Sequence, residues 1–335
     1  MILHPGILAL LLSSLLICTM TLWAAGFGAI ILRRWDISSG SELQLALERR
    51  TYLISTIVGY FLLFQLVSLF LFIRTADGIS HLFVGAMCAV GALTANPYGY
   101  PTLLLKVITF ILAGLWLIVN RADTLGYDYP LIRAKYLLLA LIAPLVLAEN
   151  VAQWCYFLRL SPDIITSCCG TLFSQGSRGV ASEIAALPSA PMQAAFCGVA
   201  VLTTAAAVRF LLDGRGGYLF AALSAIQFPV AIAAMISFIS PYVYEMPSHH
   251  CPFCLLQREY GYLGYPLYGL LLTAAVAGIG VGALEPYRDR ESLKRLLPAL
   301  RGRLAAVALL SLFIFSVMVA WLIAGSSLDM GGYWE

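Results

Sequence analysis

The chain has 335 residues, of which 61% are hydrophobic and only 11% are charged, and its formal net charge is +3. A soluble domain carries about 25% charged residues, so this composition excludes a soluble globular protein and predicts an integral membrane protein. The basic residues are spread over short segments between apolar runs, which argues against nucleic-acid binding.

Eight apolar runs reach the length of about 20 residues that a helix needs to cross the hydrocarbon core. In chain order they are Gly6–Leu32, Thr51–Ile73, Pro101–Asn120, Tyr136–Leu158, Pro191–Leu212, Tyr218–Ser240, Tyr260–Leu284 and Leu304–Gly325. The stretch His81–Ala95 contains glycine and precedes Asn-Pro, so it predicts a re-entrant or interfacial segment. The sequence therefore predicts an all-α, polytopic transmembrane helix bundle that forms a single integral membrane domain, residues 1–335, in contact with lipid.

The distribution of basic residues predicts the sides of the membrane. Fifteen of the 20 lysines and arginines lie in or beside the first, third, fifth and seventh loops. Cytoplasmic loops carry such an excess, so we expect both termini on the extracytoplasmic side of a bacterial inner membrane. The cysteines of the remaining loops then lie where disulfides form; they are Cys88, Cys168, Cys169, Cys251 and Cys254.

The two halves of the chain share a short pattern. Each half has an outer histidine and cysteine followed by Tyr-Gly-Tyr and an inward-going span: His81, Cys88 and Tyr98–Tyr100, then His250, Cys251 and Tyr260–Tyr262. The pattern is compatible with a four-plus-four duplication of residues 1–160 and 190–325, joined by an outer loop at 160–190, or with coincidence.

The octapeptide Cys251–Arg258, preceded by His249 and His250, has the clearest chemistry in the chain. Two cysteines at this spacing close a small reactive disulfide or hold a soft metal ion. The apolar run that follows places them in the first turn of the seventh span or in the loop just before it. At a helix start, unpaired N–H groups and the dipole would stabilise a thiolate. A bridge over so short a loop gains little chain entropy, which favours a redox role over a purely structural one.

Cys251, Cys254, Gln257 and Arg258 form a Cys-x-x-Cys, two apolar residues and Gln-Arg before an inward-going helix. In this octapeptide the chain resembles the DsbB family of quinone-linked, thiol-oxidising membrane proteins. The resemblance implies that Arg258 contacts a membrane quinone within a cofactor-binding segment that includes Gln257. It also implies that Cys254 faces the quinone, while Cys251 exchanges with an extracytoplasmic thiol protein. With Arg258 four residues after Cys254, we expect it one turn deeper on the same helix face.

The DsbB family has four spans, and its second cysteine pair follows the first, whereas here a second pair has to come from upstream. Cys168 and Cys169 are the first candidates, with Cys88 the other. Adjacent cysteines rarely bridge each other because the small ring strains the peptide bond. As catalytic residues they would relay electrons to Cys251; a structural disulfide and a metal-binding pair are the alternatives.

Three functions follow from these residues. The first is a quinone-dependent thiol–disulfide oxidoreductase, an electron-transport enzyme with redox-active cysteines. The second is a membrane protein that transports or handles copper, mercury or zinc, with His249, His250, Cys251 and Cys254 as ligands. The third is a membrane anchor or assembly subunit with structural disulfides, associated with other subunits of a membrane complex.

Lys106 and Glu149 are the charged residues that we expect within the hydrocarbon core. At a rise of 1.5 Å per residue, Lys106 lies roughly 7 Å and Glu149 roughly 10 Å from the outer surface. The similar depths predict an ion pair between the third and fourth spans, serving either a proton route or helix packing.

Overall fold

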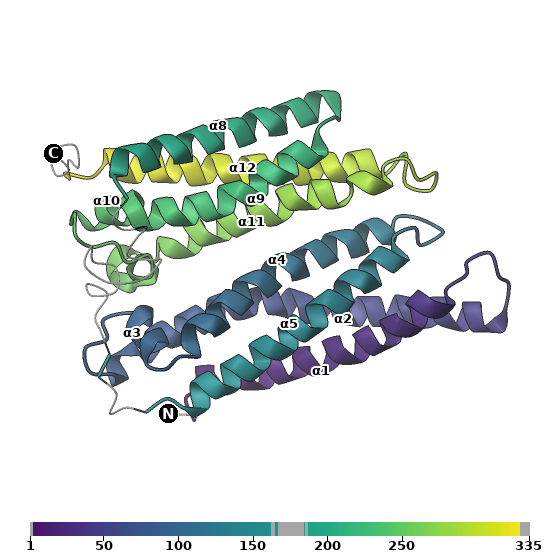
Figure 1. Cartoon of the computed structure of the whole chain (residues 1–335), viewed down its shortest axis with the longest axis horizontal. Helices are drawn as coiled ribbons and strands as arrows, with labels where there is room; N and C mark the ends of the chain where they lie inside the picture. The colour runs from purple at the N-terminus through teal and green to yellow at the C-terminus, as the bar shows by residue number, and fades with distance from the viewer. Residues whose placement is uncertain (1–2, 162–164, 167–183, 185–186, 329–335) are drawn as a thin grey trace. The chain divides into compact units, whose positions relative to one another are not determined.

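The computed structural model describes residues 3–161, 165–166, 184 and 187–328. Within these ranges the chain forms helices, turns and loops and no named strand, and eight of its helices are long and apolar enough to cross a membrane (Figure 1). The prediction of an all-α, polytopic helix bundle is thereby confirmed. Many large apolar side chains of these helices are exposed, as lipid contact requires.

The long helices are α1 (Pro5–Arg34), α2 (Glu42–Gly78), α4 (Gly99–Asp123), α5 (Ile132–Leu158), α8 (Ser189–Asp213), α9 (Gly217–Ala234), α11 (Gly264–Ala283) and α12 (Leu297–Ala324). A π-helical segment, η2 (Met235–Ile239), and α10 (Ser240–Tyr244) continue α9 without a break. The short elements are α3 (Ala89–Thr94) and the 3-10 turns η1 (Ser80–Leu82), η3 (Cys254–Leu256), η4 (Arg258–Tyr260) and η5 (Glu285–Tyr287).

Six of the eight predicted spans lie inside observed helices. The last span begins earlier than expected, at Leu297, and the seventh begins later, at Gly264. Helix α2 is longer than a membrane requires: its 37 residues would extend about 55 Å. Arg49 and Arg50, expected in a loop, therefore lie in its amino-terminal part. The stretch 81–95 contains no helix long enough to span the membrane.

The chain divides into two compact units, each with four of the long helices as its principal elements. Unit 1 comprises Met1–Thr75, Asn96–Leu160 and Ala283–Arg301, and unit 2 comprises Ala76–Ala95, Ser161–Gly282 and Gly302–Glu335. In unit 1, α1 packs on α5 and α5 on α4, around a core that contains Trp116 and Tyr136. In unit 2, α8 packs along α9, and one apolar cluster contains all three cysteines of the loops that the structure describes.

Unit 1 holds the predicted ion pair. Lys106 Nζ lies 2.8 Å from Glu149 Oε1, and both side chains are almost completely buried. Lys106 also donates to Ser68 Oγ at 2.7 Å. The second carboxylate oxygen of Glu149 accepts from Thr109 Oγ1 at 2.5 Å and from Gln65 Nε2 at 2.6 Å. The pairing inferred from depth alone is confirmed, and each charge is further compensated by neutral hydrogen-bonding groups.

Candidate functional site

Of the two positions expected for Cys251 and Cys254, the structure has the loop before the seventh span and not its first turn. Cys254 opens the 3-10 turn η3, Gln257 is extended, and the turn η4 ends at Gly261 in the left-handed region, with φ 62°. Helix α11 starts only at Gly264, ten residues after Cys254. The expected helix-start stabilisation of a thiolate therefore has no basis in the structure.

The same break overturns the expected position of Arg258. A separation of four residues places two side chains on one face only within a continuous helix, and Gln257, with ψ 160°, interrupts the helical conformation between Cys254 and Arg258. Arg258 is exposed, whereas Cys254 is buried. The prediction that the guanidinium lies one turn deeper than the thiol was wrong.

A third cysteine joins the pair. Cys88, the residue before α3, places its Sγ 3.7 Å from Cys251 Sγ. The sulfur atoms of Cys88, Cys251 and Cys254 all lie within 4.8 Å of one another. Cys88 and Cys251 are fully buried, and Cys254 is 5% exposed. From the sequence, Cys88 was one of three upstream candidates. The signals for it were its loop, expected on the same side as Cys251, and its place in the short pattern shared by the two halves.

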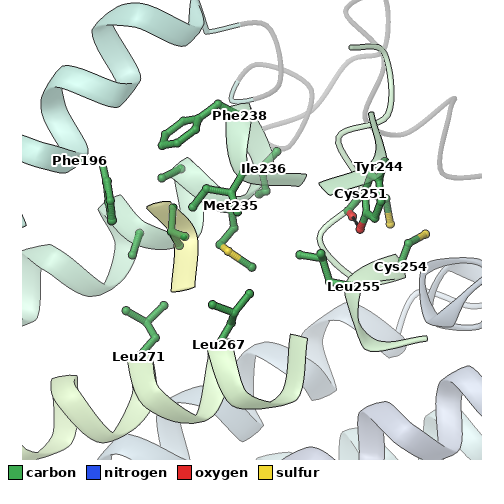
Figure 2. Packing of buried hydrophobic residues seen from close by; sticks show 14 of the residues in the cluster. Phe196, Met235, Ile236, Phe238, Tyr244, Cys251, Cys254, Leu255, Leu267 and Leu271 are labelled. Atoms are coloured by element: carbon green, nitrogen blue, oxygen red, sulfur yellow. Dashed lines mark hydrogen bonds between the residues drawn. The ribbon is translucent and has the colours of Figure 1, made fainter. Parts of the chain in front are cut away.

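Two tyrosines fix the loop that carries the pair. The hydroxyl of Tyr244 donates to the carbonyl of Cys251 at 2.6 Å, and that of Tyr268 donates to the carbonyl of Pro252 at 2.9 Å. Figure 2 shows Tyr244 beside Cys251, with Cys254 on the following turn and Leu255 directed toward the apolar cluster. These contacts hold the backbone of the loop from α10 and α11, so the positions of its thiols are determined by the helix bundle.

Gln257 links the two loops that supply the thiols. Its side-chain amide donates to the carbonyl of Met87 at 2.8 Å and to the carboxylate of Asp77 at 3.2 Å. Because Met87 precedes Cys88, this contact fixes the backbone next to the third thiol. The glutamine that the resemblance assigned to a cofactor-binding segment thus makes structural contacts within unit 2.

The two histidines before the pair occupy different environments. His249 is half-buried, its Nε2 lies 3.4 Å from Cys254 Sγ, and its ring packs edge-on against Tyr244. Burial lowers the pKa of His249, which the Cys88 thiol partly opposes, so the neutral imidazole is favoured. His250 is buried, and its Nδ1 lies 3.0 Å from the carbonyl oxygen of Ile236.

The expected ligands His249, His250, Cys251 and Cys254 therefore do not form one group. Among the described residues, the group of metal-ligating atoms consists of three thiols, and His249 touches one of them. Cys168 and Cys169 lie outside the described residues.

One of the three sulfur–sulfur distances can be compared with that of ligands around a thiophilic ion. In a tetrahedral zinc site with Zn–S bonds of about 2.3 Å, neighbouring sulfurs are about 3.8 Å apart, close to the 3.7 Å between Cys88 and Cys251. A disulfide would need about 2.05 Å. Comparisons with protein-family models, with curated proteins and with solved structures found no match to this chain.

Proposed function

We propose that this chain is a membrane protein that binds a soft metal ion, Zn(II) or Cu(I), through Cys88, Cys251 and Cys254, with His249 as the fourth ligand. The observation that carries the proposal is the convergence of three buried thiols within 4.8 Å. Thiolates and imidazole together suit Zn(II) and Cu(I) better than hard cations, which prefer oxygen ligands.

Burial of the thiols bears on their charge: without a metal, buried cysteines stay neutral thiols. A thiolate removed from water is costly unless a cation compensates its charge, and a metal ion deprotonates and neutralises the thiols that bind it. The one partly exposed member of the site is His249.

The ligands of the proposed site come from two separate loops, so they need not crowd into one short segment. Four ligands from His249–Cys254 alone would be cramped, but Cys88 comes from a loop 163 residues away from Cys251. Metal binding would then join two loops of unit 2. Since the positive-inside bias predicts that both loops lie on the extracytoplasmic side, we propose that the ion is acquired there and that the protein handles or transports it.

Metal analysis of the purified chain tests the proposal. Protein prepared in detergent with a reductant should contain close to one equivalent of zinc or copper per chain. Cys88→Ser, Cys251→Ser and Cys254→Ser should each lower the metal content, while Cys155→Ser, the matched control, should not, because Cys155 lies in unit 1. Wild-type protein without stoichiometric metal, even after reconstitution with Zn(II) and Cu(I), would refute the proposal.

A second candidate is the thiol–disulfide oxidoreductase. The observation that favours it is the same 3.7 Å approach of Cys88 to Cys251, because a third thiol beside the pair can exchange with its disulfide. In this scheme the thiols of Cys251 and Cys254 form a disulfide and release two protons and two electrons, which reduce a quinone to a quinol. The dithiol is restored by an extracytoplasmic thiol protein, with Cys168 or Cys169 as relay.

Arg258→Ala separates the two candidates. A guanidinium donates hydrogen bonds and cannot ligate a metal, so this change should leave the metal content unchanged. If quinone docks against Arg258, the same change should slow reoxidation of the Cys251–Cys254 pair, followed by thiol trapping at limiting quinone. Because Arg258 is exposed and not on the helix that the resemblance requires, we expect no quinone-dependent reoxidation in the wild type or in the variant. Quinone-dependent reoxidation that Arg258→Ala slows would favour the oxidoreductase.

A further inference from the structure

One carbonyl in the sixth span, that of Ile236, has neither its α-helical nor its π-helical N–H donor. In an α-helix the carbonyl of Ile236 would accept from Ser240, and in a π-helix from residue 241. Ser240 instead donates its N–H to Met235, within the π-helical segment. Residue 241 is a proline and has no N–H to donate. A buried carbonyl in this position needs a partner from elsewhere.

His250 supplies that partner. Its Nδ1 lies 3.0 Å from the oxygen of Ile236, and its side chain is 3% exposed. A carbonyl only accepts, so Nδ1 carries the hydrogen in this contact. His250 directly precedes Cys251, and through this bond the loop reaches back to the span. The carbonyl that Pro241 leaves without a donor thus becomes an anchor for the loop with the thiol pair.

We propose that His250 is a positioning residue of the metal site, which acts by its hydrogen bond to Ile236 and does not ligate the ion. This inference rests on the proposed metal site. The bond fixes the backbone at Cys251 on one side, while the Tyr244 hydroxyl fixes its carbonyl on the other. Together they hold the Cys251 sulfur toward Cys88. Groups that orient metal ligands in this way typically contribute about 10- to 100-fold to metal affinity.

Substitutions of His250 that differ in where they place an N–H test the proposal. The amide nitrogen of asparagine occupies nearly the position of Nδ1, whereas that of glutamine lies one bond farther out. His250→Asn should therefore keep zinc affinity near the wild-type value, measured by chelator competition on the full chain in detergent. His250→Gln and His250→Ala should bind zinc about 10- to 100-fold more weakly. Ser237→Ala, in the same π-helical segment, is the control and should bind normally.

Cobalt spectra distinguish positioning from ligation. If His250 only positions the site, Co(II)-loaded His250→Ala should keep the thiolate charge-transfer bands and the d–d band positions of the wild type, at higher cobalt concentration. Shifted d–d bands, without rescue by asparagine, would overturn the proposal in favour of a ligand role. Normal zinc affinity in both His250→Gln and His250→Ala would also overturn it.

Failure of the proposed function and failure of the positioning role give different results. Wild-type protein that binds neither zinc nor cobalt refutes the proposed function itself, whereas normal zinc affinity in both His250→Gln and His250→Ala refutes only the positioning role. If His250→Ala is not recovered as folded protein, the comparison of asparagine with glutamine decides, because both are polar and differ in the reach of the amide.

Discussion

The buried ion pair of unit 1 allows a quantitative test of the helix packing. Glu149→Gln keeps the size of the side chain but removes its charge. Its amide has one acceptor oxygen and one donor nitrogen, while the two carboxylate oxygens of Glu149 accept from Lys106 on one side and from Thr109 and Gln65 on the other. Turned toward Lys106, the NH₂ group would face an ammonium group that only donates, and turned the other way it would replace an oxygen that accepts two hydrogen bonds. In either case Lys106 loses its counter-charge.

The expected loss follows from the burial of both partners. Removing one member of a buried ion pair typically costs about 3–5 kcal/mol, because the other charge stays uncompensated. This corresponds to a roughly 100- to 5,000-fold change in the ratio of folded to unfolded protein. Replacing both partners by apolar residues, Lys106→Met with Glu149→Leu, leaves no unpaired charge and should destabilise by less than Glu149→Gln alone. In the cycle formed by Lys106→Met, Glu149→Leu and their combination, the double variant should therefore lose less stability than the sum of the two single losses.

Unfolding by denaturing detergent in mixed micelles, followed by tryptophan fluorescence, measures these differences. Four of the six tryptophans lie in unit 1, so the signal reports mainly on the unit that contains the pair. Glu259→Gln, an exposed acid in unit 2, is the matched control and should change the free energy of unfolding by less than about 0.5 kcal/mol. If Glu149→Gln behaves like the control, or if the two single losses simply add, the pair does not hold the helices as argued.

Three further predictions concern the spans and the bundle of unit 2. A topology reporter fused after Leu32 should be cytoplasmic and one after Glu335 extracytoplasmic; the reverse at either position would invert the proposed side of the thiol site. Both polar side-chain atoms of Gln227 lack a hydrogen-bond partner among the described residues, beside a cavity of about 10 Å³. Gln227→Leu should therefore stabilise unit 2 by about 1–3 kcal/mol, and a loss of stability would instead indicate a bound water. Gly278→Ala should destabilise by about 1–3 kcal/mol because its Cβ would overlap a serine hydroxyl of α9, whereas Gly269→Ala, which meets no neighbour, should be neutral or slightly stabilising in the same assay.

The membrane spans could be predicted from the sequence because the bilayer imposes a local rule. A helix that crosses the hydrocarbon core needs about 20 apolar residues, and each run is visible without knowledge of its neighbours. The pairing of Lys106 with Glu149 followed from the same rule, since a charge in hydrocarbon requires a partner at its own depth. In both cases the property depends on position along one helix.

The length of the apolar run did not predict where the seventh span starts. The residues from Tyr260 onward are apolar enough for a span, but the extended Gln257 and the left-handed Gly261 end the short turns one after another, and the helix starts only at Gly264. Amino-acid composition does not predict such backbone conformations. The error carried over to Arg258, whose expected position depended on a helix that the chain does not form there.

The tertiary structure determines which residues come together at the candidate metal site. The sequence identified Cys251 and Cys254 as reactive through their spacing alone, but Cys88 is separated from Cys251 by 163 residues and reaches it only when the loops of unit 2 fold together. The adjacent His249 and His250 are equivalent in the sequence. They differ in the fold because one faces a thiol and the other faces a carbonyl that a proline has left without a donor. Residue type determines which chemistry a side chain can perform, whereas its partners depend on packing between segments far apart in the chain.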